Sequence, residues 1–402
     1  MPPRSNNPRS GRVAIICSNN GSNCLGRSLL LADLLRPQWD ASVVGVQTTA
    51  RPWEPGASFD VPVRSFPIRS AAQLPNAVAW LRKEVQGARV IVCKPKPTSL
   101  GLALAAGVRP SQAVLDVDDW DLGFGDAPGS RGELYRRAPY YLKTLLHPGR
   151  FNSYLGVRAA FGLIPAFPHR IVSNGWLRRK VGGELLPHVR DSSMFDPAGV
   201  DREQRRAALA LSARPWVGFI GTIRPHKGIE DLIAALSQLG GVNAPGLLLA
   251  GLSAEHVAEE RALLAAAQER LGEDRVRFAY KFPFRELPSY LAAPDVICIP
   301  SRPGATSAGQ IPAKLFDALM MGKPLVISDA HDTSDVDADA AVRFHAGDVS
   351  DLAAKLQDLC GSPAHQERLG ARARAVALER FDYAAARSVL VPLLERLPPQ
   401  RG

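Results

Sequence analysis

Short, unbroken apolar runs alternate with helical patterns along almost the whole chain, and this alternation most constrains the fold. In a parallel sheet covered by helices on both faces, each strand is buried on both sides and reads as a continuous apolar segment. Helical spacing separates the runs; in residues 227–239, for example, Ile229, Leu232, Ile233 and Leu236 share one stripe. The apolar runs are residues 12–17, 41–47, 89–94, 113–117, 170–174, 216–222, 246–251, 276–280, 295–300 and 324–328.

This order of strands and helices predicts two doubly wound, Rossmann-like α/β domains. The stretch near residues 196–214 is charged and contains proline, which is typical of a connection between domains. We therefore predict one domain over residues 1–205 and a second over 206–402. The last amphipathic helix, about 382–397, is expected to pack back on the first domain.

Composition points to a cytoplasmic protein. No apolar run reaches the roughly 18–20 residues that a membrane span needs. The polar, proline-rich start leads directly into a strand pattern, so we expect no signal peptide. The five cysteines are odd in number and widely spaced, which suits reduced thiols rather than a disulfide framework or a zinc site: Cys17, Cys24, Cys93, Cys298 and Cys360.

The net charge of +10 is concentrated in residues 131–190, where eleven Lys and Arg face only Glu133 and Glu184. Aromatic residues are interleaved with these cations. One interpretation is a set of solvated helix faces with buried rings. The other is a surface for anionic lipid headgroups, giving peripheral membrane contact, or for a polyanionic substrate. No nucleic-acid-binding motif accompanies the charge, so we expect no nucleic-acid partner.

Common nucleotide and hydrolase motifs are missing from the sequence. GxGxxG follows none of the candidate first strands, and no GxSxG nucleophile elbow occurs. Gly304 and Gly309 have the separation of a Walker loop, but Gln310 follows where lysine is needed. Hydride transfer and P-loop phosphoryl transfer are therefore disfavoured.

A first candidate site lies in residues 221–233, GTIRPHKGIEDLI. Gly221 ends a strand, and Arg224 and Lys227 lie just before a helix. Two cations beside a helix N-terminus can neutralise a diphosphate, and a glycine lets the backbone approach it closely. The alternative is an ordinary strand–turn–helix corner, where Lys and Arg are common.

A second candidate site lies in residues 301–329, a small-residue loop followed by a helix and a strand. Pro312 suits the first helical turn, and Gly322 with Pro324 marks the end of the helix. Lys314 and Asp317 are three residues apart and share a face near the helix start. The alternative for these two is a solvent-exposed ion pair. Both candidate sites are expected at the carboxyl ends of strands in one sheet.

Acidic residues follow the strand at 113–117 in the sequence DVDDWDLGFGD. Trp120 stands where a calcium loop needs a ligand, so the spacing is not that of a calcium site. Three interpretations remain open: a binding site for a hydroxylated or cationic acceptor, a solvated turn, or a cation site. The residues are Asp116, Asp118, Asp119 and Asp121.

Two further polar segments are candidates near the same strand ends. Asn19, Asn20 and Gly21 follow the first strand, and ordinary turn chemistry explains them equally well. In residues 187–191, PHVRD, Arg190 and Asp191 suggest a structural ion pair, with a donor-facing role as the alternative.

The segment GTIRPHKGIEDLIAAL, followed some eighty residues later by PAKLFDALMMGKPLVISD, resembles the retaining glycosyltransferases of the GT-B fold that use nucleotide-sugars, the large family-four group. The order of elements from about 213 to 385 fits the donor domain of that family. The resemblance implies that residues 1–205 bind the acceptor and residues 206–402 bind the donor.

The resemblance also implies residue roles on the donor side. Arg224 and Lys227 would hold the diphosphate, with Gly221 beside them. Backbone N–H groups of residues 309–311 (Gly309, Gln310 and Ile311) would face the donor sugar, and Asp317 would bind ribose hydroxyls.

The sequence departs from the family at one position. The family has a Glu eight residues before the second acid, where this chain has Gly309. The sequence PAKLFD is similar to a variant of the motif, so Lys314 would supply the phosphate or sugar contact instead.

A retaining, metal-independent transfer is the reaction that the resemblance implies. The leaving diphosphate would accept the proton of the acceptor, and no resident cofactor or metal is expected. The catalytic candidates are Arg224, Lys227 and Asp118, and the acceptor-binding candidates are Asn20, Gly21, Asp116 and Asp119.

The partners are a nucleotide-sugar, with a UDP-sugar favoured, and a hydroxylated acceptor such as a saccharide, a lipid-linked molecule or a natural product. The alternatives are a non-catalytic GT-B module that binds a sugar nucleotide or a membrane, and a GT-B sugar-nucleotide epimerase.

Overall fold

The computed structural model describes residues 11–53, 56, 58–124, 152–252, 257–304, 307 and 309–400. The chain forms two compact units: unit 1 is Met1–Pro187 with Ala386–Gly402, and unit 2 is His188–Ala385. The division predicted from composition lay at 205/206, whereas the structure divides the chain at 187/188. The charged stretch near 196–214 contains α7 (Arg202–Ala208), a helix of unit 2, rather than an extended connection.

Unit 1 contains a seven-stranded sheet in which every pair of neighbours is parallel. Its strand order is β3-β2-β1-β4-β5-β6-β7, the doubly wound arrangement predicted from the sequence. The strands are β1 (Arg12–Cys17), β2 (Asp40–Gln47), β3 (Val63–Pro67), β4 (Ala88–Cys93), β5 (Ala113–Val117), β6 (His169–Val172) and β7 (Glu184–Leu185).

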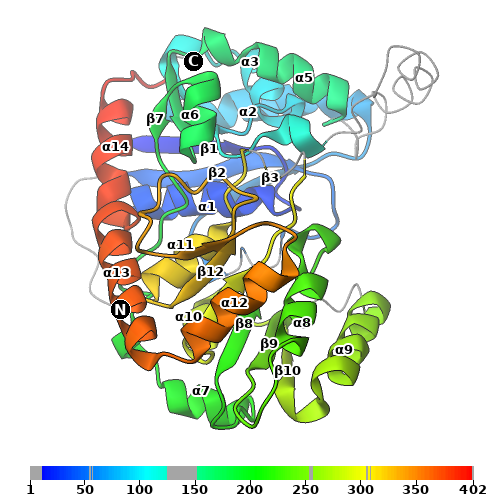
Figure 1. Cartoon of the computed structure of the whole chain (residues 1–402). Coiled ribbons are helices and arrows are strands. Elements are labelled where there is room, and N and C mark those ends of the chain that lie inside the picture. The colour runs from blue at the N-terminus through cyan, green and yellow to red at the C-terminus, as the bar shows by residue number, and fades with distance from the viewer. Residues whose placement is uncertain are drawn as a thin grey trace. The chain divides into compact units, whose positions relative to one another are not determined.

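Helices cover both faces of this sheet (Figure 1). The face with Ala14 and Ile16 packs with the apolar sides of α2, α3 and α5, while α1 lies on the other face. Because both faces are covered, β5 is buried at every position, as its continuous apolar sequence predicts. The helices are α1 (Cys24–Leu35), α2 (Leu74–Val85), α3 (Leu102–Ala105), α5 (Tyr154–Gly162) and α6 (Gly175–Val181).

The C-terminal segment completes unit 1. The helix expected at about 382–397 is α14 (Tyr383–Glu395). Arg387 Nε donates to the carbonyl of Leu34 at 2.8 Å, and Arg89 Nε donates to the carbonyl of Leu394 at 2.9 Å. Gln400 exchanges backbone hydrogen bonds with the start of β4. The segment is therefore hydrogen-bonded to elements from the beginning of the chain.

Unit 2 contains a six-stranded, all-parallel sheet in the order β10-β9-β8-β11-β12-β13. The strands are β8 (Trp216–Ile220), β9 (Gly246–Leu252), β10 (Val276–Tyr280), β11 (Val296–Ile299), β12 (Leu325–Ser328) and β13 (Val342–Phe344). Besides α7, its helices are α8 (Ile229–Ser237), α9 (Val257–Leu271), α10 (Leu287–Ala292), α11 (Ala313–Met320), α12 (Val349–Cys360) and α13 (Pro363–Arg380).

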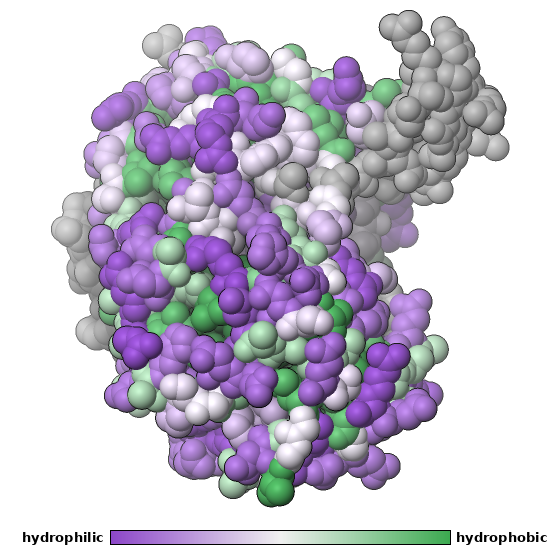
Figure 2. Space-filling view, in the orientation of Figure 1, coloured by the Kyte–Doolittle hydropathy of each residue, from purple (hydrophilic) through white to green (hydrophobic). Residues whose placement is uncertain are grey.

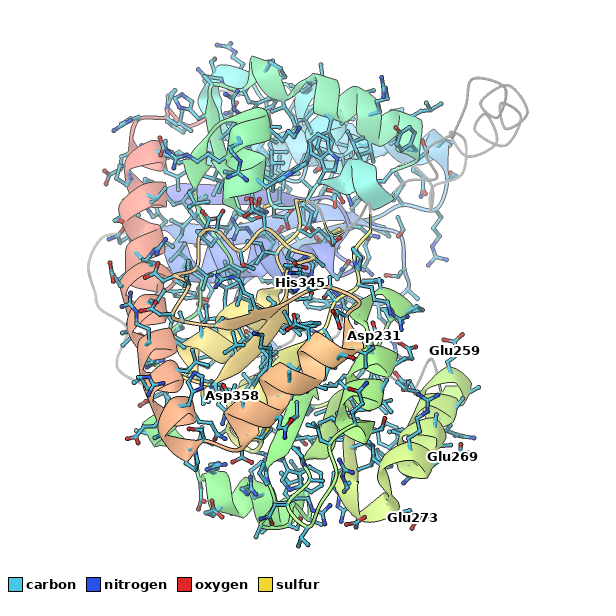
Figure 3. The ribbon with its side chains drawn as sticks, viewed as in Figure 1. Asp231, Glu259, Glu269, Glu273, His345 and Asp358 are labelled. Atoms are coloured by element: carbon cyan, nitrogen blue, oxygen red, sulfur yellow. The ribbon has the colours of Figure 1, made fainter. Side chains whose placement is uncertain are left out.

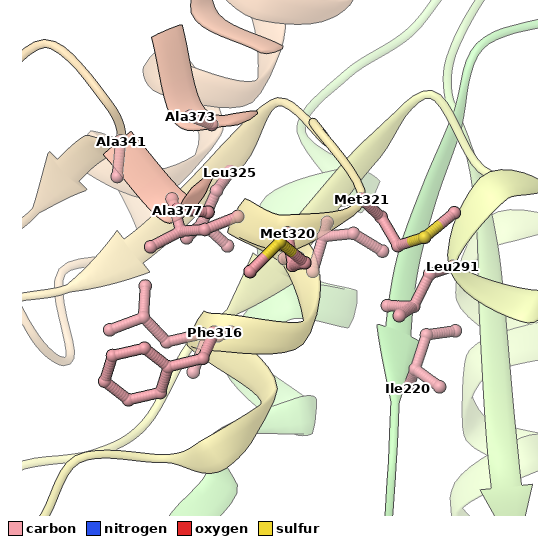
Figure 4. Packing of buried hydrophobic residues seen from close by; sticks show 14 of the residues in the cluster. Ile220, Leu291, Phe316, Met320, Met321, Leu325, Ala341, Ala373 and Ala377 are labelled. Carbon is pink, nitrogen blue, oxygen red and sulfur yellow. The ribbon is translucent and has the colours of Figure 1, made fainter. Parts of the chain in front are cut away.

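The core of unit 2 has one layer on each face of the sheet. On one face, Phe316 and Met320 of α11 pack with Ile220, Leu291 and their neighbours (Figure 4). The other layer is formed with α8, α9 and α12. These layers hold α8 and α11 against the sheet, with their N-termini after the carboxyl ends of β8 and β11, where open α/β sheets bind ligands.

Hydrophilic residues predominate on the face shown in Figure 2, and hydrophobic residues form only small separate groups there. Among the described helices, none is both long enough and apolar enough to cross a membrane.

Candidate functional site

The turn after β8 is built on two glycines with positive φ. Gly221 has φ +132° and Gly228 has φ +70°. A Cβ atom on Gly228 would lie 1.9 Å from the carbonyl oxygen of Pro300, so only glycine lets this turn approach the end of β11. Arg224 is exposed and Lys227 is half-buried in this turn, immediately before α8. Both predicted cations are thus placed at the N-terminus of a helix.

The loop after β11 is tied to the same turn. Arg302 makes two hydrogen bonds to the carboxylate of Asp231, at 2.8 and 2.7 Å, and its backbone N–H donates to the carbonyl of His226 at 3.0 Å. Asp231 lies in the first turn of α8 (Figure 3). The two candidate sites in the sequence, 221–233 and 301–329, are therefore joined by a bidentate ion pair.

Lys314 brings a third cation to this place. Its Nζ lies 3.7 Å from the ring centroid of Phe219, and a Cβ on Gly221 would lie 3.1 Å from the same atom. Burial and the charge of Lys227 lower the pKa of Lys314 well below its usual value. Burial, Lys227, Arg224 and Lys314 lower the pKa of His226 in the same way. The cations repel one another, so a bound anion would relieve this repulsion.

The described part of the 301–311 loop is held by local hydrogen bonds. Ser307 Oγ accepts from the N–H of Gly304 at 2.9 Å and donates to its carbonyl at 2.7 Å. Gly309 has φ +74°, and the carbonyl of Gln310 lies 2.9 Å from Nδ1 of His331. Ile311 is buried. The sequence did not single out His331, because one histidine after a strand carries no pattern.

Asp317 differs from its predicted environment. It is buried and forms an ion pair with Arg190, so it is not in a solvent-exposed pair with Lys314. Arg190 also donates to the carbonyls of Val189 and Ala313. Arg190 is therefore in a structural ion pair, as its sequence suggested, but with Asp317 and not with Asp191. In this structure Asp317 is engaged by Arg190 and does not present its carboxylate to solvent.

Asp116 in unit 1 is also a buried partner of an arginine. Arg27 Nη2 lies 3.0 Å from Oδ1 of Asp116, and Arg27 Nε lies 3.2 Å from Oδ2. The same guanidinium donates to the carbonyls of Leu186 and Pro187. Because Asp116 is fully buried with both oxygens occupied, it stabilises unit 1 and leaves an acceptor little access.

The other predicted aspartates surround Lys94, which the sequence did not identify. Lys94 Nζ lies 2.7 Å from Asp118, 2.6 Å from Asp119 and 3.9 Å from Asp121. Lys94 is 6% exposed and has φ +66°, a conformation rare outside glycine. Burial, only partly offset by Lys94, raises the pKa of Asp118 to about 7.

A second lysine completes this cluster. Lys96 Nζ lies 2.8 Å from Asp121. The available signal was Lys94 at the end of the run at 89–94 and Lys96 just after it. Because β4 and β5 are neighbours that end at the same edge of the sheet, these lysines are expected near the aspartates that follow β5. Within the parts of the chain that the structure describes, no His, Cys, Asp or Glu cluster is arranged to hold a metal ion.

Asn20 and Gly21 lie at the end of β1. Asn20 is fully buried and donates to the carbonyl of Arg64 at 3.1 Å and to Ser65 Oγ at 2.9 Å, so its side chain ties β1 to β3. Gly21 is half-buried, and a Cβ there would lie 1.8 Å from Thr49 Oγ1. Glycine is therefore required by close packing at this position.

The basic region predicted over 131–190 is described only from residue 152 onward; residues 131–151 lie outside the described part. In the described portion, Trp120 contacts both Phe161 and Trp176 edge to face. Arg178, Arg179 and Lys180 are exposed in the last turn of α6, where cations complement the helix dipole.

Comparison with known proteins gives a family match within unit 2 and solved structures of similar fold. Residues 214–362 match the family model of the glycosyl transferases group 1, which covers less than half of the chain. The structure is similar to Anabaena HepE in complex with UDP-glucose, with a TM-score of 0.70 and 18% identity over 96% of this chain and 100% of that one. It is also similar to sucrose-phosphate synthase from Thermosynechococcus elongatus, with a TM-score of 0.67 and 18% identity over 96% and 99% of the two chains. These likenesses and the two parallel sheets confirm the predicted GT-B fold.

Three curated relatives have glycosyltransferase names. A D-inositol 3-phosphate glycosyltransferase of Segniliparus rotundus is 30% identical over 42% of this chain and 39% of its own length. A GDP-mannose-dependent alpha-(1-6)-phosphatidylinositol monomannoside mannosyltransferase of Mycolicibacterium smegmatis is 25% identical over 52% and 56%. A 2-deoxystreptamine glucosyltransferase of Streptomyces kanamyceticus is 25% identical over 45% and 46%. The matches thus span 39% to 56% of these relatives.

Proposed function

We propose that this protein is a glycosyltransferase that moves a sugar from a nucleotide-diphosphate donor, bound by unit 2, to a hydroxylated acceptor, bound by unit 1. The observation that carries the proposal is the group of mutually repelling cations at the start of α8, formed by Arg224, Lys227 and Lys314 around Gly221. A helix N-terminus and clustered cations are a site for a phosphate group. The match of residues 214–362 to glycosyl transferases group 1 supports a nucleotide-sugar as the source of that phosphate.

The catalytic role of this cation group is electrostatic. As the bond between the sugar and the diphosphate breaks, negative charge grows on the leaving diphosphate. Arg224, Lys227, Lys314 and the N-terminus of α8 stabilise that charge more strongly in the transition state than in the ground state. The leaving phosphate oxygen accepts the proton of the acceptor hydroxyl, and the sugar is transferred with retention. We propose that these side chains make a divalent metal unnecessary, so that chelation with EDTA leaves turnover unchanged.

On the acceptor side, we propose that Asp119, the more exposed of the two carboxylates that contact Lys94, accepts hydrogen bonds from acceptor hydroxyls, and that the buried Asp118 holds Lys94 in place. Asp116 and Asn20 then act as supports of the sheet edge rather than as direct ligands. We further propose that the preferred donor is a UDP-sugar. We also propose that the protein is cytoplasmic and contacts a membrane surface through residues 131–190.

Calorimetric titration with UDP, GDP, ADP and dTDP tests the donor site. We expect the wild type to bind one nucleotide, and the double variant Arg224→Ala/Lys227→Ala to bind it about a hundredfold more weakly, because two charged hydrogen-bond donors are lost. The control is Arg285→Ala/Arg368→Ala, which removes the same charge from two exposed positions of the same unit.

Loss of affinity in the control as well would show only a general charge effect. Failure of all four nucleotides to bind the wild type would refute the proposed donor site. If a nucleotide binds but the matching nucleotide-sugar is neither transferred nor hydrolysed, the non-catalytic binding module is the better conclusion. The substitution of the family acid by Gly309 is the observation that keeps this alternative open.

A further inference from the structure

His331 is a buried residue that the proposed mechanism does not use. It follows β12, which ends at Ser328, and only 6% of it is exposed. Its Nδ1 lies 2.9 Å from the carbonyl oxygen of Gln310, in the loop before α11. His331 therefore connects the segment after β12 to the loop that we propose faces the donor sugar.

The protonation state of this ring follows from its surroundings. Burial, with a contribution from the charge of Lys227, lowers the pKa of His331 to about 4, so the ring is neutral near pH 7. A neutral imidazole carries one N–H, and a carbonyl oxygen can only accept a hydrogen bond. The proton is therefore assigned to Nδ1, which donates to Gln310. Nε2 is buried and makes no hydrogen bond of good geometry among the residues that the structure describes, although the backbone of Ser307 lies near the ring.

The loop has a conformation that needs such support. Gly309, directly before Gln310, has φ +74°, and the N–H of Gln310 donates to the carbonyl of Ser307 at 3.2 Å. Ser328 Oγ donates to the carbonyl of Ser301 at 2.7 Å, at the beginning of the loop. Two side chains from the end of β12 and just beyond it thus hold the loop, Ser328 at its start and His331 at its end.

We propose that His331 is a positioning residue of the donor site: its Nδ1–H holds the Gln310 carbonyl and so fixes the backbone of residues 309–311 for contact with the sugar part of a nucleotide-sugar. This inference rests on the proposed function. His331 does not touch the nucleotide in this scheme, so its hydrogen bond affects recognition of the sugar and leaves recognition of the nucleotide diphosphate almost unchanged.

Three substitutions separate this hydrogen bond from the volume of the ring. In His331→Asn, the amide nitrogen is the same number of bonds from Cα as Nδ1, so it can donate to Gln310. In His331→Gln, the amide nitrogen corresponds to Nε2 instead, and His331→Leu has no donor at all. The measured quantity is the dissociation constant of a nucleotide-sugar divided by that of its nucleotide, by calorimetry at pH 7.5. The probe pairs are UDP-glucose with UDP and GDP-mannose with GDP.

We expect this ratio to rise about tenfold in His331→Leu and His331→Gln, and to stay within about twofold of the wild-type ratio in His331→Asn. The affinity for the nucleotide alone should change little in all three variants. An unchanged ratio in His331→Leu overturns the inference. An equal rise in His331→Asn also overturns it, because the shape of the ring would then matter rather than its donor. If His331→Leu fails to fold, the comparison of Asn with Gln decides. Failure of the wild type to bind any probe refutes the proposed function, and the role of His331 with it, and this outcome is distinct from the others.

Discussion

Replacing Lys94 by methionine tests the buried charge cluster of unit 1. Methionine keeps a long side chain and the Cβ atom, so the cost of the positive φ at this position is the same in both proteins. The substitution removes an ammonium that lies 2.7 Å from Asp118 and 2.6 Å from Asp119. Asp118 is 3% exposed, so water cannot replace the lost partner.

Removing one partner of a buried ion pair costs about 3–5 kcal/mol, because the remaining charge stays buried. For a unit of this size we expect the midpoint of thermal unfolding to fall by roughly 6–20 °C. The loss should also depend on pH. Lys94 has a raised pKa and is protonated throughout pH 5 to 8, so its own titration adds no pH dependence in that window. The dependence comes from Asp118, whose pKa is raised to about 7. Without it, Asp118 gains a proton more easily, so the loss is smaller at pH 5 than at pH 8.

Urea unfolding followed by tryptophan fluorescence measures this effect in unit 1. Five of the six tryptophans lie there, and only Trp216 lies in unit 2. The control is Lys83→Met on the exposed side of α2, for which we expect a change within about 0.5 kcal/mol. The reasoning is refuted if Lys94→Met costs less than about 1 kcal/mol at pH 8, or if the cost is larger at pH 5.

Three further substitutions test other features by urea unfolding. The folded-state pKa of Asp118 is raised from 3.8 to about 7, so the stability of the wild type falls as pH rises through this range. Asp118→Asn lacks this titration and should therefore gain stability relative to the wild type between pH 5 and pH 8. A stability difference that does not change with pH would contradict this sign. Gly228→Ala should cost more than about 2 kcal/mol, because Gly228 has a positive φ and the new Cβ would meet the carbonyl of Pro300. The control Gly240→Ala places its Cβ in open space and should change stability by less than about 0.5 kcal/mol. Equal effects would show that packing at the turn is unimportant. Arg190→Met should cost about 3–5 kcal/mol by leaving Asp317 buried without its partner, and a near-zero cost would mean that Asp317 is hydrated.

The sheets were predictable because buried parallel strands have a strong local signal. β1, β5, β8 and β11 are short apolar runs buried along nearly their whole length. β3 and β13 are edge strands with partly exposed residues and no continuous apolar run, so the sequence did not predict them. Strand prediction thus succeeded for the buried strands and for the edge strand β10, whose sequence VRFAY is rich in β-branched and aromatic residues.

The spatial grouping of the candidate residues was predictable only where those residues are close in sequence. Arg224, Lys227 and Gly221 lie in one such turn. The partners of Asp116 and Asp317 are Arg27 and Arg190, which are 89 and 127 residues away. Nothing in the local sequence identifies a partner at that distance, so two aspartates that looked available for ligands proved to be structural.

The two segments that form unit 1 impose an order on folding during synthesis. Unit 2 is continuous from His188 to Ala385, so all its residues have been made before Ala386–Gly402 leave the ribosome. The segment of unit 1 before His188 is made first, but buried residues of α14 such as Leu390 and Leu394 are missing from its core until residues 386–402 have been made. The N-terminal sheet must therefore persist as an incomplete intermediate while the second unit folds. A ribosome-stalled chain in which residue 385 is followed by a flexible linker long enough to span the exit tunnel should show a protease-resistant unit 2 beside a protease-sensitive unit 1.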